Sequence, residues 1–144
     1  MKLRIVWIGK TKDPNLIALV ADFSARIKRF LPLEITELKD SRTDSDKLLA
    51  TLDASDRVVA LDERGAAWTS PQLAAFVGNH MTKDPRRLTF VIGGHAGLAD
   101  VVKKRADQTW ALSPLTFTHD MTRVLLLEQI YRALTIIHNH PYPR

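Results

Sequence analysis

The chain contains the stretch Phe90-Val91-Ile92-Gly93-Gly94-His95-Ala96-Gly97 and, shortly after it, Trp110-Ala111-Leu112-Ser113-Pro114-Leu115-Thr116-Phe117-Thr118-His119. Each begins as an apolar run typical of a buried strand and ends in a tight loop, the first rich in glycine and the second containing Ser-Pro. Open α/β sheets bind ligands at the carboxyl ends of their strands. Because the intervening residues suffice for only one helix, we expect the two loops to be neighbours and to build a pocket from main chain.

Outward from these segments, strand and helix patterns alternate along the whole chain. The predicted strands cover residues 2–8, 33–38, 57–61, 88–92 and 109–112. The predicted helices run from Asp13-Pro14 to about Phe30, over a short stretch ending near Leu52, from Thr69-Ser70-Pro71 to about Met81, and over 98–106 and 120–138. A turn is predicted at residues 62–65. This alternation predicts an α/β fold, a mainly parallel sheet with helices on both faces.

The predicted helix 120–138 has apolar side chains in almost every direction. A surface helix keeps a polar face, so this one is expected to be buried on two sides. In so short a chain the second side is best supplied by another copy, which predicts a homodimer. A deeply central helix within one chain is the alternative.

The amino-acid composition limits the classes of protein to which the chain can belong. A chain of 144 residues with 45% hydrophobic residues and no cysteine predicts a single domain over residues 1–144 without disulfides or thiolate metal sites. No apolar run approaches the roughly 20 residues that cross a bilayer, and the N-terminus lacks the features of a signal peptide. We therefore expect a cytoplasmic protein with no membrane association.

The charge is unevenly distributed. The net charge is +5, and residues 73–144 carry nine Lys and Arg against five Asp and Glu, while residues 1–72 carry twelve against eleven. The excess thus lies mostly in the half that holds the two loops. A basic surface around a pocket favours a polyanionic partner such as RNA.

Several familiar motifs are incomplete. Gly9-Lys10-Thr11 lacks the first glycine of a phosphate-binding loop, and the 93–97 segment lacks the dinucleotide pattern. The five histidines show no metal-ligand spacing, so no metal is predicted. Ser113 has no nucleophile elbow that would expose it. Glu128 and Arg132, four residues apart on an apolar helix, form either a stabilising pair or part of a site.

Taken in order, these segments closely resemble the small SPOUT-class methyltransferases of the RlmH family. The resemblance covers the whole chain and rests on the following segments: 1–6 with Gly9-Lys10, Leu61-Asp62, 70–74, 90–94 with Gly97-Leu98, 110–113, Leu115-Thr116, His119, 123–125, 128–133 and 139–142.

The resemblance implies a parallel α/β sheet with a deep C-terminal trefoil knot, and a homodimer formed through the last helix. It implies S-adenosyl-L-methionine as cofactor and N3 of a pseudouridine in large-subunit ribosomal RNA, within the assembled ribosome, as the methyl acceptor. The implied cofactor-binding residues are Leu61, Gly93, Gly94, Leu112, Ser113, Pro114, Leu115, Thr116 and Phe117.

Four residues are predicted to surround the target base by their motif positions: His119, Arg123, His140 and Tyr142. A histidine can accept the imide proton near neutral pH. Arg123 can stabilise a developing anion or a phosphate, and Tyr142 can stack on a splayed base.

Two departures from the family pattern concern the reaction rather than the cofactor loops. Pro143 stands where many members have a final histidine, and His95-Ala96 replaces a common Pro-Glu. Two other functions stay open at this point. One is a non-catalytic ribosome- or RNA-binding factor with the same fold, and the other is an ordinary nucleotide-binding enzyme, which the incomplete phosphate motifs disfavour.

Overall fold

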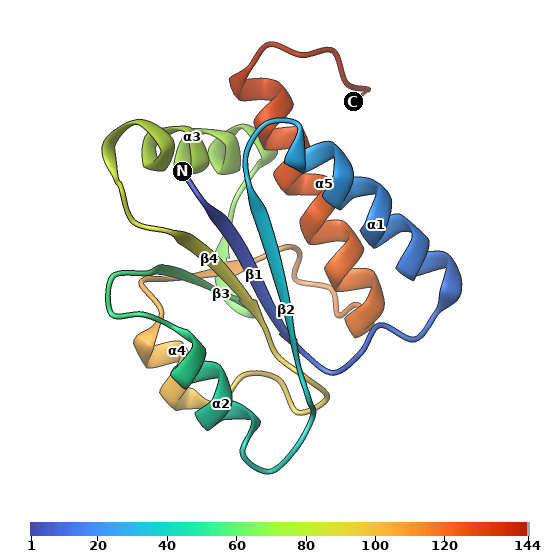
Figure 1. The fold of residues 1–144 in the computed structure, drawn as a ribbon, viewed down its shortest axis with the longest axis vertical. Helices are drawn as coiled ribbons and strands as arrows, with labels where there is room; N and C mark the ends of the chain where they lie inside the picture. Colours follow the sequence, from blue (N-terminus) through green and yellow to red (C-terminus); the bar gives the residue numbers. More distant parts are fainter. Residues whose placement is uncertain (144) are drawn as a thin grey trace.

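Five parallel strands form one sheet in the order β2-β1-β4-β3-β5 in the computed structural model, which describes residues 1–143 (Figure 1). The strands are β1 (Leu3–Ile8), β2 (Leu33–Leu38), β3 (Arg57–Ala67), β4 (Leu88–Ile92) and β5 (Gln108–Ala111). The helices are α1 (Pro14–Lys28), α2 (Asp44–Thr51), α3 (Ser70–Lys83), α4 (Asp100–Arg105) and α5 (His119–Ile137). The predicted α/β class and all ten predicted elements are confirmed, with small shifts at their ends except in β3, which extends to Ala67 instead of ending at Leu61.

Helices cover both faces of the sheet. Helices α1, α3 and α5 pack on one face, and α2 and α4 pack on the other (Figure 1). Successive residues of each central strand serve opposite faces: Trp7 joins the first core, whereas Val6 and Ile8 join the second. This two-sided burial explains why β1 and β4 are continuous apolar runs rather than alternating ones.

Helix α5 is the central helix of the three-helix face. It lies on the sheet between α1 and α3, and Leu126, Leu127 and Leu134 are fully buried within one chain. Most of the apolar surface of α5 is thus covered by α1, α3 and the sheet, while Met121 and Ile136 stay 38% and 40% exposed. The alternative of a central helix is therefore confirmed, and the homodimer stays a prediction. No helix within residues 1–143 is long and apolar enough to span a bilayer.

Helix starts follow the expected local chemistry. The Asp13 side chain accepts a hydrogen bond from the Asn15 amide at the start of α1, and Pro14 takes the first helical position. Helix α3 begins with a capping box, in which Thr69 accepts from the Gln72 amide and Gln72 accepts from the Thr69 amide. The deep knot implied by the resemblance concerns threading, which strand order does not describe, and it stays a prediction.

The turn predicted at residues 62–65 was wrong, because β3 continues to Ala67 through an irregularity. Trp110 of β5 pairs with Leu61 and again with Ala66, so the residues between them form a bulge. Gly65 makes this possible: a Cβ there would lie 2.7 Å from the Thr109 carbonyl carbon and the Trp110 nitrogen. The strand resumes because glycine permits this close approach to β5.

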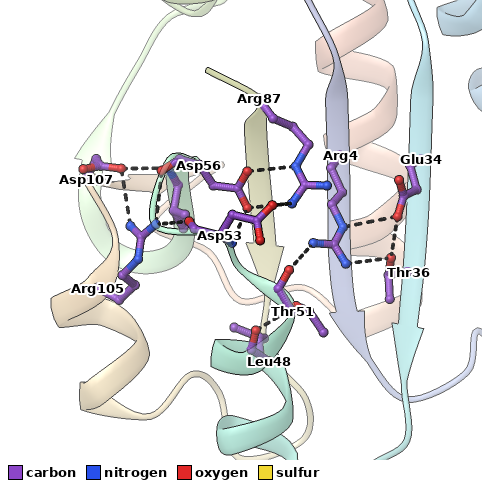
Figure 2. Close-up of polar contacts among 11 residues, drawn as sticks. Arg4, Glu34, Thr36, Leu48, Thr51, Asp53, Asp56, Arg87, Arg105 and Asp107 are labelled. Carbon is purple, nitrogen blue, oxygen red and sulfur yellow. Dashed lines mark hydrogen bonds and ion pairs between the residues drawn. The ribbon is translucent and has the colours of Figure 1, made fainter. Parts of the chain in front are cut away.

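A polar network ties the amino ends of the strands to α2 and α4 (Figure 2). Arg87 donates to both carboxylate oxygens of Asp56, at 2.8 and 2.7 Å, and Asp56 is only 2% exposed. Burial alone would raise the pKa of Asp56, but the hydrogen bonds from Arg87 and from the Asp53 amide outweigh it and lower that pKa. Arg4 extends the network by donating to the Thr51 carbonyl at the end of α2.

We expect Asp56→Ala to lower the free energy of unfolding by about 2–3 kcal/mol, because it leaves the Arg87 guanidinium without its bidentate partner. Urea unfolding followed by circular dichroism measures this. Asp53→Ala is the matched control, since the Asp53 side chain is 74% exposed and lies 3.5 Å from the same arginine. Its loss should stay below about 1 kcal/mol. Equal losses for the two variants would contradict a special role for the buried pair.

Candidate functional site

A cavity of about 460 Å³ lies at the carboxyl ends of β3, β4 and β5. Three segments build it: the β3 bulge at residues 61–64, the glycine loop at 92–98 and the loop after β5 at 112–117. Its volume falls in the range of small-molecule sites, roughly 300–1,000 Å³. We refer to it as the first cavity. It confirms that the two loops quoted from the sequence are neighbours in space.

The glycine loop is shaped by its own main chain. The Gly97 amide donates to the Gly94 carbonyl at 2.9 Å, and Gly97 has a φ of +76°. A Cβ on Gly93 would lie 2.5 Å from the Gly97 carbonyl carbon and 2.7 Å from the Leu98 nitrogen. The glycines therefore serve first to fold the loop back on itself, which turns its main chain toward the first cavity.

Side chains of the bulge link it to the loop after β5 and to α4. Thr116 donates to Glu63 at 2.8 Å, and Lys103 of α4 pairs with Asp62 at 3.1 Å. Burial alone would raise the pKa of Asp62, but the Arg64 amide and Lys103 lower it. The sequence reasoning missed Asp62, Glu63, Arg64 and Lys103 as lining residues. For Asp62, Glu63 and Arg64 the available signal was their position directly after the apolar run 57–61; Lys103, in α4, had no such signal.

The predicted cofactor-binding residues lie together. All of them line the first cavity except Pro114, which is exposed beside it. Of the four predicted catalytic residues, His119 alone lines the first cavity.

A second cavity, of about 1060 Å³, adjoins the first at the carboxyl ends of β1 and β2. Its lining comes from residues 8–13, residues 37–40 and the start of α5. Among residues 1–143, only His95 and His119 line both cavities. Their rings meet edge to face with centroids 6.2 Å apart, so the two histidines form the boundary between the cavities.

Arg123 lies in the wall of the second cavity and is 1% exposed. It donates to the Ile8 carbonyl at 2.8 Å and to the Thr11 hydroxyl at 2.9 Å, and it packs over the Trp7 ring. Burial lowers the pKa of its guanidinium. With these partners, Arg123 orients the loop after β1, and a direct contact with substrate stays a prediction.

Asp120 holds the same loop from the first turn of α5. Its carboxylate accepts from the Lys12 and Asp13 amides at 2.9 and 3.0 Å. Burial would raise the pKa of Asp120, but these hydrogen bonds and the Arg123 charge lower it. Asp120 and Arg123 therefore fix the shape of the second cavity from one helix.

His140 lies at the end of α5 away from both cavities, where its amide donates to the Thr135 carbonyl, and Tyr142 folds back along the second half of the helix. The helix has 19 residues and is about 28 Å long. Tyr142 packs edge to face on Tyr131, and its hydroxyl donates to Glu128 at 3.4 Å. Burial raises the pKa of Tyr142. One chain therefore does not bring these two residues to the boundary histidines.

The predicted Glu128–Arg132 pair forms, at 3.5 Å, and it holds the tail rather than a cavity. Arg132 also donates to the Pro143 carbonyl at 2.8 Å and packs over the Tyr142 ring. Within residues 1–143, no group of His, Cys, Asp and Glu side chains is arranged to hold a metal ion.

This arrangement, with loops gathered at the carboxyl ends of β3, β4 and β5, has clear counterparts. A family model described as "Predicted SPOUT methyltransferase" matches residues 1–143. The chain belongs to this SPOUT methyltransferase family. A Trichlorobacter lovleyi protein named "Ribosomal RNA large subunit methyltransferase H" is 48% identical to it, with 99% of each chain covered.

Two solved structures share the fold. A probable methylase family protein from Haemophilus influenzae has a TM-score of 0.61 at 14% identity, covering 99% of this chain and 72% of that one. The SpoU methyltransferase AviRb from Streptomyces viridochromogenes, in complex with AdoMet, has a TM-score of 0.50 at 13% identity, covering 90% of this chain and 56% of that one. As a SPOUT family member, the chain is a methyltransferase that uses S-adenosylmethionine.

The first cavity fits this cofactor. Leu61, Ile92 and Leu112 offer apolar surface for a purine ring, and the glycine loop offers main-chain groups that no side chain covers. Asp62 and Glu63 also line the cavity and offer carboxylate oxygens to ribose hydroxyls, with Arg64 and Lys103 balancing their charge. Size, apolar surface and polar groups therefore agree with an adenosine-containing ligand.

We expect Gly93→Ala to weaken S-adenosylmethionine binding by at least about tenfold, because the new methyl group must displace main chain at Gly97 and Leu98. Isothermal titration calorimetry measures the dissociation constant. Gly78→Ala is the matched control, since its Cβ would lie 3.5 Å from the nearest atom of Ile137, an ordinary contact inside α3. If Gly93→Ala binds S-adenosylmethionine as tightly as the unaltered protein, the glycine loop is not part of the cofactor site.

Proposed function

We propose that this SPOUT methyltransferase methylates N3 of a pseudouridine in large-subunit ribosomal RNA, within the assembled ribosome. The observation that carries the proposal is the first cavity, built from the β3 bulge and the loops after β4 and β5 and bounded by His95 and His119. The Trichlorobacter lovleyi relative, through its name and its full-length match, supports ribosomal RNA as substrate. A ribosomal substrate makes the cytoplasm the expected compartment.

In this proposal the chain positions the reactants and removes a proton. Bound S-adenosylmethionine supplies an electrophilic methyl group. Leu61 and the segments 93–94 and 112–117 hold the cofactor, and Thr116 and Glu63 keep two of these segments together. His119, at the boundary of the cavities, accepts the proton from the base nitrogen. Positioning and general-base catalysis together account for the acceleration that such a transfer needs.

We expect His119→Ala to lower kcat by about 10²-fold or more, because general-base catalysis contributes roughly that factor. The dissociation constant for S-adenosylmethionine should stay within about twofold, since glycine and apolar groups carry that binding. Steady-state transfer of labelled methyl, with calorimetry on the same sample, separates the two effects. Equal activity of variant and unaltered protein would exclude His119 as the proton acceptor.

The position of the tail supports a homodimer with shared sites. Met121, Leu125 and Ile136 lie along one side of α5, and Met121 and Ile136 are 38% and 40% exposed. Pairing this side with the same side of a second copy, with the helices antiparallel, brings the tail of one protomer toward the cavities of its partner. His140 and Tyr142 would then complete the partner's site, and Arg123 would orient the loop beneath it.

A mixture of two inactive variants tests this sharing. His119→Ala removes a residue of the cavities, and Tyr142→Ala removes a residue of the tail. In a mixed dimer, one of the two sites keeps both residues. After subunit exchange we expect activity to return in about a quarter of all sites. A mixture no more active than its components would mean that the tail does not act across the dimer.

The proposed function itself is tested by transfer of labelled methyl from S-adenosylmethionine to unmodified ribosomes, with free large subunits and naked RNA in parallel. Mass mapping of the digested RNA identifies the nucleoside. We expect label in a methylated pseudouridine, strongest in assembled particles. Cofactor binding without label in any of the three substrates would contradict the proposal and favour a non-catalytic RNA-binding factor.

A further inference from the structure

The second cavity is not explained by cofactor binding. At about 1060 Å³ it is more than twice the volume of the first cavity, and it opens over the loops that follow β1 and β2. Asp120 and Arg123 hold the first of these loops through main-chain and hydroxyl contacts. A cavity with a fixed wall and this volume is large enough for a nucleotide with part of its neighbours.

The cavity presents available positive charge. Lys10, Lys12 and Lys39 are exposed at its edge. None of the three ammonium groups forms an ion pair or a side-chain hydrogen bond within residues 1–143. Unpaired lysines that converge on one opening suit phosphate groups, which they bind as point charges.

Four carboxylates also line the cavity, and three of them already have partners. Asp13 caps α1, Asp120 accepts from two loop amides, and Glu37 accepts from the Trp7 indole at 2.9 Å. These neutral donors hold the three carboxylates in place without cancelling their charge. Asp40 is the fourth, exposed next to Lys39. The charged groups of the lining that no hydrogen bond or ion pair holds within residues 1–143 are thus Asp40 and the three lysines, which leaves an excess of mobile positive charge.

We propose that the second cavity binds the RNA strand around the acceptor nucleotide, with the phosphates on Lys10, Lys12 and Lys39. The acceptor base then faces the boundary histidines His95 and His119, the only side chains within residues 1–143 common to both cavities. This inference rests on the proposed function, because it assigns the acceptor of that reaction. It also gives His95 a role beside His119, in contact with the base.

The geometry accounts for each bond of the transfer. The base nitrogen gives its proton to an imidazole at the boundary, and solvent then receives that proton. The nitrogen forms a bond to the methyl carbon, the bond between this carbon and sulfur breaks, and the electron pair stays on sulfur. The cation thereby becomes a neutral thioether. Both partners must meet at a shared wall for an in-line displacement, and the histidine boundary is that wall.

The test compares two double variants with the same change of charge. Lys10→Ala with Lys39→Ala removes two cations from the second cavity. Lys47→Ala with Lys104→Ala removes two exposed lysines from α2 and α4, on the other face of the sheet. For each protein we measure binding to unmodified large-subunit particles at several salt concentrations, S-adenosylmethionine binding by calorimetry, and methyl transfer.

For the cavity variant we expect the slope of log affinity against log salt to fall by about 2, roughly one per lost phosphate contact. KM for particles should rise, while cofactor binding stays unchanged. The control should keep the slope and KM of the unaltered protein. Equal slopes in both double variants, whether lowered or not, would overturn the inference. Binding to particles is measured separately from methyl transfer. If the unaltered protein binds particles through these lysines but never methylates them, the proposed function is contradicted and the inference about the second cavity is not.

Discussion

Close approach of main chain to main chain at the carboxyl end of the sheet is the constraint on which the rest of the site depends. Gly65 lies against the Thr109–Trp110 backbone and Gly93 against the Gly97–Leu98 backbone, at distances that exclude any side chain. The first contact lets β3 rejoin β5 after its bulge, and the second folds the glycine loop. Together they shape two of the three segments that line the first cavity, through main-chain contacts that have no rotamers to order on binding.

Helix α5 carries residues of the cavities at its start and the C-terminal tail at its end. Its first turn carries His119, Asp120 and Arg123, which border the cavities and hold the loop after β1. The tail follows its last turn and packs back on Tyr131 and Glu128, in the second half of the helix. Because the middle of the helix is buried between α1 and α3, it holds the cavity residues and the tail on one packed core.

Charge is divided between the two ends of the sheet. At the amino ends, arginines are paired with carboxylates, as in Arg87 with Asp56, and contribute to stability (Figure 2). At the carboxyl ends, lysines around the second cavity are left without ion pairs within residues 1–143. The net charge of +5 therefore does not by itself identify the surface that binds a polyanion. That surface is set by where the unpaired cations lie.

The sequence by itself determined the fold class, the order of the elements and the two loop segments that line the first cavity. Apolar runs, caps such as Thr69 with Gln72, and glycines after strands are local signals, and each specifies local structure. The turn expected at residues 62–65 failed because pairing with β5, a distant contact, outweighed a local turn signal. Tertiary structure alone decided three further things: that α5 is buried within one chain, that His95 and His119 share a boundary, and that His140 and Tyr142 lie far from it. Each depends on distances between residues remote in sequence, which packing of the whole chain sets and no local pattern encodes.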